Sequence, residues 1–579
     1  MSDGFSIIIL LLAATGPLFF VLLPALRRLP FSRILPILPA MLALLVSQSF
    51  SIQVPLLASQ ITLGFGTNGK WILGCTILLW LVVLATINQQ RFKLDYVFVA
   101  LFMLTIASSV ANVVTHSLLA FYLFFTLIGY ACYGLLIQAC GKPVQRAAKI
   151  YLILQIFGDL IIFELCLVLA TKVSVLNFTS LSPAFVAPET QGLILGLALL
   201  GIIAKAGIWP LHFWLPMVFR CAPVSIMILL GIILPSTAMF GWFNLFSELE
   251  NVTTEWPDRM QIMGLASLFY SVVVGLTQKH PGSVLAYVLL ALESQLTIVF
   301  GNFLSRPVGV DYPSKLLILP IIHYALSGTA LVLSMKLAAP ATRRFARFWI
   351  WLIPVCVCLT GTAFIATMIS VRRGMGITGL EILSLTALTL LLVRFGYLVQ
   401  TYPKIKSAKL FNVLAILQTG LVMLTLASLS YWLNSLTAQG LAIPELRPAA
   451  AALLAGLFIG FSIWKLFKRW KILEYPHIPP GDFVVPLEYL ANTIRRRGYY
   501  FSRRTLPALK AQFLTLIGFP WKANQLLAAF KNGEKNLQHW RTAIILMLSL
   551  GLTLGGSPRI ENLLRKSPFW PDFPIILVK

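Results

Sequence analysis

Several ionisable side chains inside long apolar segments of this 579-residue chain could carry out chemistry. They are Asp159, Glu164, Lys205, Glu293, His323 and Glu381. Because a charge in hydrocarbon costs several kcal/mol, ionisable groups at such positions are rare and typically belong to ion or proton pathways. Carboxylates, an amine and an imidazole can each take up and release a proton. The chemistry that this set predicts is therefore proton transfer in an apolar environment.

Lys205 is the strongest of these candidates, because two helix-breaking prolines follow it. The segment reads AKAGIWPLHFWLP and contains Pro210 and Pro216. Proline removes a backbone donor from a helix, and a helix break at membrane depth is tolerated only inside protein or beside a hydrated cavity. We therefore expect Lys205 to exchange a proton as a partner carboxylate moves. The alternative is a lysine that extends to the membrane surface.

The composition requires elements that span a lipid bilayer. Hydrophobic residues make up 58% of the chain and charged residues 11%, against roughly 25% charged residues in soluble domains. At about 20 residues per span, this excess excludes a soluble enzyme, a disordered chain and a single-anchor receptor. The predicted spans lie near residues 5–24, 34–56, 71–88, 95–114, 117–139, 150–171, 192–209, 223–246, 260–278, 282–303, 316–338, 348–370, 377–400, 410–435 and 449–467, with a weaker sixteenth at 542–555. We expect an all-α polytopic membrane protein whose first span is retained rather than cleaved as a signal peptide.

The net charge of +26 is expected to orient these spans. Basic residues lie mainly in loops between apolar segments, where they favour the cytoplasmic side of the plasma membrane, so nucleic-acid binding is not expected. This places the N-terminus outside, although the basic loops do not alternate strictly with the spans. Residues 468–540 are basic with interleaved Leu, Phe and Trp, which predicts an amphipathic segment along the cytoplasmic membrane surface or a partner subunit. A solvated basic tail is the alternative.

Four motifs resemble those of a known family in their order and spacing. They are QIFGD ending at Asp159, AKAGIWPLHFWLP around Lys205 followed by PVS at Pro223 to Ser225, TQKHPGSVLAY ending at Tyr287, and IIHYALSGTALVLS around His323. Together, over roughly residues 60–435, they resemble the antiporter-like membrane subunits of respiratory complex I, Mrp cation/proton antiporters and membrane-bound hydrogenases. Within the second motif we interpret His212 as an interfacial residue rather than a metal ligand.

The resemblance implies a fold of two inverted five-helix repeats, each with a broken helix. It also implies a lateral helix after the last repeat. On this chain the expected parts are N-terminal helices at 1–94, a first repeat at 95–246 with its break near 205–216, a second repeat at 260–400 with its break near 354–370, C-terminal helices at 401–467, the lateral segment at 468–540, and a possible last span within 541–579.

The resemblance further implies a proton path, from which this sequence departs. Lys205, Asp159 and His323 match the lysine of the first broken helix, the sixth-span aspartate and an eleventh-span histidine. Phe125 and Thr126 stand where the family has a Trp-Glu pair whose glutamate partners the lysine, and two relay lysines are replaced by neutral residues. We expect the substitutes to be Glu164, Glu293, Glu381 and Arg372.

The function implied by the resemblance is proton or sodium translocation by one membrane subunit of a multisubunit complex, with other membrane subunits as its partners. The sequence contains no recognisable haem, flavin, iron–sulfur or zinc ligand pattern, so no cofactor and no catalytic centre of its own are expected. Two alternatives stay open. One is the membrane subunit of an inorganic-carbon uptake system energised by the ion gradient. The other is a degenerate, non-conducting scaffold.

Overall fold

The structure is a computed structural model. It describes residues 3–23, 26, 34–45, 52–54, 61–64, 69–87, 95–141, 144–173, 175–181, 188–246, 255–305, 315–338, nine positions between 348 and 361, 379–401, 408–437 and 447–469. The chain divides into two compact units, Met1–Ile52 with Thr62–Gly481 and Gln53–Ile61 with Asp482–Lys579. All helices given below belong to the first unit. The predicted lateral segment beyond residue 469, the last span near 542–555 and Arg372 lie outside the described residues.

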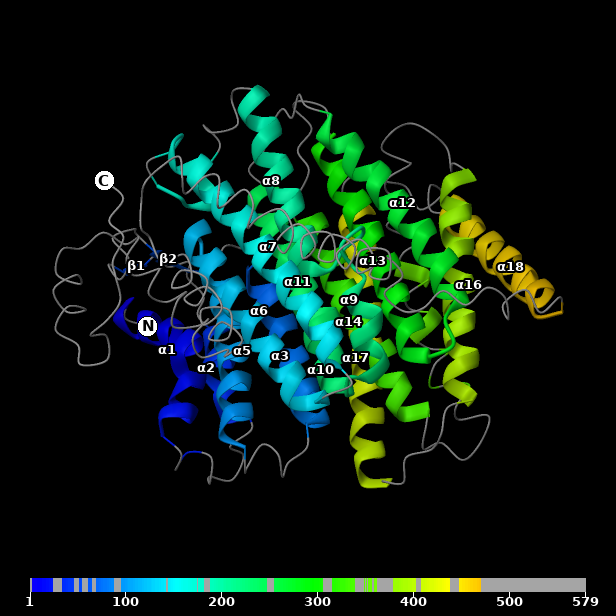
Figure 1. Ribbon diagram of the computed structural model, residues 1–579, viewed down its shortest axis with the longest axis horizontal. Helices are drawn as coiled ribbons and strands as arrows, with labels where there is room; N and C mark the ends of the chain where they lie inside the picture. The colour runs from blue at the N-terminus through cyan, green and yellow to red at the C-terminus, as the bar shows by residue number, and fades with distance from the viewer. Residues whose placement is uncertain are drawn as a thin grey trace, which may run out of the picture. The chain divides into compact units, whose positions relative to one another are not determined.

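The described residues form helices apart from two short strands (Figure 1). The helices are α1 (Asp3–Leu22), the 3₁₀ turn η2 (Leu35–Ile37), α2 (Leu38–Ala43), α3 (Gly69–Thr86), α5 (Tyr96–Val114), α6 (Leu118–Cys140), α7 (Gln145–Ala170), the 3₁₀ turn η5 (Phe178–Ser180), α8 (Pro188–Ala206), α9 (Trp214–Cys221), α10 (Val224–Ile228), the π-helix η7 (Leu229–Ile233), α11 (Leu234–Phe246), α12 (Trp256–Thr277), α13 (Pro281–Leu304), α14 (Lys315–Ala338), α16 (Gly379–Thr401), α17 (Ala408–Thr437) and α18 (Arg447–Arg469). The strands β1 (Ile52–Val54) and β2 (Ile61–Leu63) form a two-stranded sheet.

Ten helical segments in the described part of the chain are long and apolar enough to cross a membrane. They are Gly69–Thr86, Tyr96–Val114, Leu118–Cys140, Gln145–Ala170, Val224–Phe246, Trp256–Thr277, Pro281–Leu304, Leu317–Leu337, Ile382–Gln400 and Val413–Tyr431. Three shorter apolar helices accompany them, at Ile8–Leu22, Thr190–Ala206 and Leu454–Leu466. The α-helical, multi-span membrane fold predicted from the composition is confirmed.

The predicted span at 34–56 is wrong as a single helix. Residues 35–37 form a 3₁₀ turn, a helix of 6 residues follows, and residues 52–54 are a strand. Pro36 and Pro39 account for the short pieces, because each lacks the amide hydrogen that a continuous helix needs at that position. Hydropathy alone does not detect this interruption.

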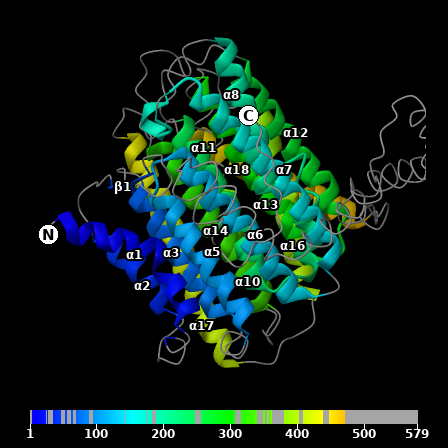
Figure 2. The same cartoon turned by 60° about the vertical axis from the view of Figure 1, so that its left-hand side comes forward.

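A group of packed helices surrounds the region of Lys205. The helix α7 packs against α6 and α8, and α9 lies against both α7 and α13. The helix α13 also packs against α12, α14 and α16. Figure 2 shows α14 in the middle of the helices, and its apolar segment Leu317–Leu337 is fully buried. The helices α7, α9, α13 and α14 are thus connected by successive helix–helix contacts.

The helix is interrupted between α8 and α9. The helix α8 ends at Ala206, and α9 begins at Trp214. Gly207 lies between them with φ +79, and a Cβ atom at this position would lie 2.7 Å from the Trp214 ring. Only glycine meets both requirements, because side chains rarely adopt this φ and the tryptophan fills the space. The second predicted break, near 354–370, lies mostly outside the described residues.

A second irregularity interrupts the span that runs through α10, η7 and α11. In η7 the amide of Leu234 donates to the carbonyl of Leu229, a bond that spans five residues instead of four. Pro235 follows directly and has no amide hydrogen, so it cannot donate to the carbonyl of Gly231 as the helical pattern would require. Such single π turns frequently occur at functional sites.

Candidate functional site

Lys205 and Asp159 form an ion pair inside the protein. The Lys205 ammonium contacts Asp159 Oδ1, and the two side chains are 0% and 2% exposed. The lysine belongs to the last turn of α8 and the aspartate to the middle of α7. Breaking such a buried pair by removing one partner costs about 3–5 kcal/mol, since the other charge is left uncompensated.

Two glycines allow α7 and α8 to approach closely enough for this pair. A Cβ atom at Gly158 would lie 2.5 Å from Lys205 Cγ and 3.0 Å from the carbonyl oxygen of Gly201. A Cβ atom at Gly201 would lie 2.6 Å from Ile162 Cγ1. The lysine stem therefore occupies the space that a side chain at position 158 would fill.

Phe125 and Thr126, on α6, complete the surroundings of the pair. The Thr126 hydroxyl donates to Asp159 Oδ1 over 2.6 Å. The Lys205 ammonium lies 4.6 Å from the centre of the Phe125 ring, a distance at which the ring face attracts a cation. The two residues that stand in place of the family's Trp-Glu pair thus both contact the buried ions.

Gln155 connects the ion pair to the helix break. It precedes Asp159 by one turn of α7, and its amide donates to the carbonyl oxygen of Lys205 over 2.9 Å. Carbonyls in the last turn of a helix lack a donor from their own helix. Gln155 supplies one, and so holds the end of α8 against the same face of α7 that carries the aspartate.

One carboxylate oxygen of Asp159 accepts hydrogen bonds from two donors, and the other accepts none. Thr126 and Lys205 both meet Oδ1, whereas the buried Oδ2 has no hydrogen-bond partner. A carboxylate oxygen that is buried without a donor is a place where a proton or a water molecule can bind. Oδ2 is therefore the atom of the pair that is left to accept a further hydrogen bond.

Glu293 occupies a second buried polar cluster. This α13 residue is 0% exposed. Its Oε1 lies 2.6 Å from the Tyr324 hydroxyl of α14, which also lies 2.6 Å from the carbonyl oxygen of Gly231 in the π-helix. Glu293 Oε2 has no partner. The structure thus brings Glu293 to the helix irregularity at Pro235.

His323 and His212 are both buried. Neither nitrogen of His323 has a hydrogen-bond partner. A Cβ atom at Gly361 would overlap the His323 ring, at 1.9 Å from Nε2, so glycine leaves the space that the imidazole occupies. The His212 ring lies 5.0 Å from that of Tyr270 and 5.9 Å from that of Tyr287.

The remaining predicted residues are placed as follows. Glu164 is exposed on α7, away from the buried pair that it was expected to serve. Glu381 belongs to α16, but its side chain lies outside the described residues, as does all of Arg372. The helix-break and motif residues are Pro210, in the segment between α8 and α9, Pro216 in α9, Pro223 at the start of α10, and Ser225 in α10. The carbonyl of Pro216 accepts a hydrogen bond of 3.2 Å from the Ser283 hydroxyl, which ties α9 to α13.

Tyr324 and Arg394 are two members of the buried polar network that were not predicted. Arg394 of α16 is 8% exposed, and its guanidinium donates to the carbonyl oxygen of Gln278 over 2.9 and 3.3 Å. Its position inside the predicted span 377–400 was a signal of the same kind as Lys205. A tyrosine in an apolar segment carries no such signal.

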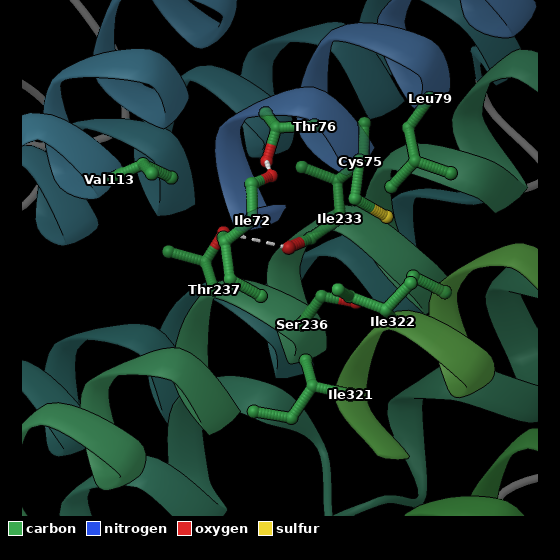
Figure 3. Close-up of a pocket in the computed structure, with 11 residues that line it drawn as sticks. Ile72, Cys75, Thr76, Leu79, Val113, Ile233, Ser236, Thr237, Ile321 and Ile322 are labelled. Atoms are coloured by element: carbon green, nitrogen blue, oxygen red, sulfur yellow. Dashed lines mark hydrogen bonds between the residues drawn. The ribbon is translucent and has the colours of Figure 1, made fainter. Parts of the chain in front are cut away.

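A small cavity of about 20 Å³ lies beside the π-helix (Figure 3). Its lining comes from α3, α5, η7, α11 and α14, and includes Ile72, Cys75, Thr76, Ser236, Thr237 and Ile322. Neither Lys205 nor Glu293 lines it, and we place no ion path through it. No group of three or more His, Cys, Asp or Glu that could hold a metal ion occurs among the residues with described positions.

Comparisons with known proteins show what this chain is similar to in sequence and in fold. Residues 115–368 match the family described as NADH:quinone oxidoreductase/Mrp antiporter, TM. The chain is 23% identical over 271 residues to NADH-ubiquinone oxidoreductase chain 4 of Mycosarcoma maydis, covering 46% of this chain and 54% of the relative. It is 21% identical over 263 residues to a Na(+)/H(+) antiporter subunit of Alkalihalophilus pseudofirmus, covering 45% and 51%.

The fold agrees with a solved membrane complex. A chain of the archaeal membrane-bound sulfane sulfur reductase superposes with a TM-score of 0.61 at 13% identity, covering 80% of this chain and 100% of that chain. The match over residues 115–368 confirms the resemblance found in the motifs. The chain spans about half the length of the curated relatives it matches.

Proposed function

We propose that this chain is a membrane subunit that translocates protons or sodium ions within a multisubunit complex. The observation that carries this proposal is the Lys205–Asp159 pair, buried where α8 ends in the middle of the helices. The matched relatives include subunits of quinone oxidoreductases and of a cation/proton antiporter. In this function the pair is a site where proton transfer and charge separation are coupled.

The energetics of the pair support this role. Both side chains are removed from solvent, so the charge of each depends on the other. If Asp159 takes up a proton, Lys205 loses its counter-ion and is left as an uncompensated buried charge, at a cost of about 3–5 kcal/mol. The lysine then releases its proton more readily. Protonation of one group therefore promotes deprotonation of the other, as a relay requires.

The rest of the proposed path lies on α13 and α14. Glu293 and His323 are buried there and carry atoms without hydrogen-bond partners, which leaves them able to take part in a transient proton chain. Glu381 and Arg372 would extend the path, and the exposed Glu164 would serve at its edge or toward a neighbouring subunit. We further propose the two inverted repeats, an outside N-terminus, and contact with partner subunits along residues 468–540.

The test is ion flux in vesicles that contain the assembled complex. We expect Lys205→Ala to abolish coupled flux, whereas Lys149→Ala, which removes an exposed lysine of α7, should not change it. Because Lys205→Ala leaves a buried carboxylate unpaired, the neutral double variant Lys205→Gln with Asp159→Asn serves as a second test with less risk to folding. Unchanged flux in both variants would exclude the relay and leave the non-conducting scaffold.

A further inference from the structure

Tyr324 has one hydroxyl hydrogen and two oxygen atoms within hydrogen-bonding distance. The carbonyl oxygen of Gly231 and Oε1 of Glu293 each lie 2.6 Å from the Tyr324 hydroxyl oxygen. A hydroxyl donates one hydrogen bond and accepts others. The carbonyl can only accept, so Tyr324 must be the donor in that contact. When that hydrogen points to Gly231, the contact with Glu293 is a full hydrogen bond if Glu293 carries a hydrogen and donates it.

The carbonyl of Gly231 cannot accept the hydrogen bond that an α-helix would give it. In an α-helix it would accept from the amide of residue 235, which is Pro235 and has no amide hydrogen. A buried carbonyl without a donor is costly, and the tyrosine hydroxyl comes from a helix 93 positions further along the chain to supply it. Tyr324 is therefore committed to Gly231 unless another acceptor competes more strongly.

A carboxylate is such a competitor, because hydrogen bonds to ionised acceptors are roughly twice as strong as neutral ones. An ionised Glu293 would attract the Tyr324 hydrogen away from Gly231. No lysine, arginine or histidine forms an ion pair with Glu293 in the part of the chain that the structure describes, and its Oε2 has no partner. Nothing there stabilises the ionised form other than Tyr324 itself.

We propose that Glu293, Tyr324 and the Gly231 carbonyl form a proton-binding site in which Tyr324 switches between two acceptors. With the proton bound, Glu293 donates to Tyr324, and Tyr324 donates to Gly231. When the proton leaves, Tyr324 donates to the Glu293 carboxylate, and the Gly231 carbonyl loses its side-chain donor. The state of one proton is thereby coupled to the hydrogen bonding of the π-helix.

The bound ligand is a proton rather than a metal cation. Oxygen atoms that share a hydrogen lie about 2.7–2.8 Å apart, which the two contacts of 2.6 Å approach. Oxygen atoms that coordinate one metal cation are arranged around it at the metal–oxygen distance. They therefore lie further from one another than two oxygens that share a hydrogen. The three oxygens here have no room for an ion between them.

Proton binding at this site does not require that the chain transports ions. A role of the site in proton transport, however, rests on the proposed function. The measurement is therefore spectroscopic: infrared difference spectra in H2O and D2O of the full chain in lipid nanodiscs at neutral pH. We expect the carbonyl stretching band of a protonated carboxylic acid, lost in Glu293→Gln. Tyr324→Phe should shift the band to higher frequency, because the acid then loses its hydrogen-bond acceptor.

Matched controls separate this site from general effects on folding. Tyr151 is also a buried tyrosine that donates to a backbone carbonyl, that of Gly129 over 3.0 Å, so Tyr151→Phe should leave the band unchanged. If Glu293→Gln fails to fold, the shift in Tyr324→Phe decides, because that variant keeps the carboxyl group. A band that persists in Glu293→Gln, that does not move in Tyr324→Phe, or that sodium removes when choline does not would overturn the proposal. A correct band in a chain without ion flux would refute the proposed function and leave this site.

Discussion

Thr126 donates to the same carboxylate oxygen of Asp159 that Lys205 contacts, over 2.6 Å. The position that resembles the family's glutamate therefore lies at the ion pair even though it carries no charge. The carboxylate at the pair is that of Asp159 on α7, the helix beside it. The buried lysine therefore has a counter-ion although position 126 is neutral.

Relocating the carboxylate should transfer its role. We expect Asp159→Asn to lower coupled ion flux by at least about tenfold, which corresponds to about 1.4 kcal/mol. Adding Thr126→Glu to that variant should restore part of the flux, since position 126 already reaches the lysine's partner oxygen. Thr126→Gln in the same background is the control, because it has nearly the same shape without the charge. Equal recovery with glutamine would show that the charge is not what the site requires.

Gly158→Ala should separate α7 from α8. Its Cβ atom would lie 2.5 Å from Lys205 Cγ and 3.0 Å from a backbone oxygen, and overpacking of this kind typically costs about 1–3 kcal/mol. Gly74→Ala on α3 is the matched control, because no atom lies within 4 Å of its Cβ position. Thermal unfolding in detergent should show a lower Tm for the first variant only. A similar Tm change in both would mean that helix propensity, rather than the contact with Lys205, sets the effect.

Arg394 should contribute to stability far more than the exposed Arg259. Arg394→Met removes two hydrogen bonds to the carbonyl of Gln278 at the end of α12, and we expect a loss of about 1.5–3 kcal/mol, as for hydrogen bonds from charged groups. Arg394→Lys should retain only part of this stability, because an ammonium group lacks the planar set of donors that a guanidinium has. Arg259 and Glu255 form a pair on the surface, 56% and 81% exposed, so Arg259→Met should cost at most about 1 kcal/mol. Denaturant unfolding compares them, and equal losses would contradict the prediction.

The start of α13 should loosen in acid. His280 lies outside the spans, and its Nδ1 accepts a hydrogen bond of 3.1 Å from the amide of Gly282. Burial first, and the nearby Arg220 charge second, lower the pKa of His280 below its ordinary value. A lowered pKa means that the unfolded segment binds the proton more readily. The stabilisation is therefore present above about pH 6.5 and is lost as the pH falls through the lower, folded value.

Hydrogen exchange of the first turn of α13 measures this effect. We expect faster exchange of the Gly282 amide as the pH falls below about 6.5, after correction for the intrinsic rate. His280→Asn keeps an acceptor at the cap without a group that titrates in this range, so its protection should be independent of pH. A pH dependence that survives in His280→Asn would assign the effect to another group.

Apolar length predicted most of the helices, because a span needs about 20 apolar residues whatever its partners are. It failed at residues 34–56, where two prolines divide a segment of adequate hydropathy. The partner of Lys205 was harder to assign. Asp159 and Lys205 are 46 positions apart, and their contact depends on how α7 and α8 pack through glycines, which no local pattern encodes.

Glu293 was recognisable from sequence as a buried carboxyl group, but its partner was not. Tyr324 is 31 positions away on another helix, and its role follows from an irregularity that Pro235 introduces into a third helix. Arg394 could have been identified by the reasoning applied to Lys205, since it is a cation within an apolar segment. Glu164 satisfied the same criterion, yet it is exposed. Charge within a span thus indicates an unusual environment without specifying which side of the helix it faces.

The two oxygens of the Asp159 carboxylate differ in their hydrogen bonding, and this difference bears on the order of proton transfer. Its Oδ1 accepts from Thr126 and Lys205, while Oδ2 has no hydrogen-bond partner. In the proposed relay, an incoming proton would attach to Oδ2 while Thr126 and Lys205 still contact Oδ1. We then expect the arrival of a proton on one oxygen to precede the departure of the lysine from the other.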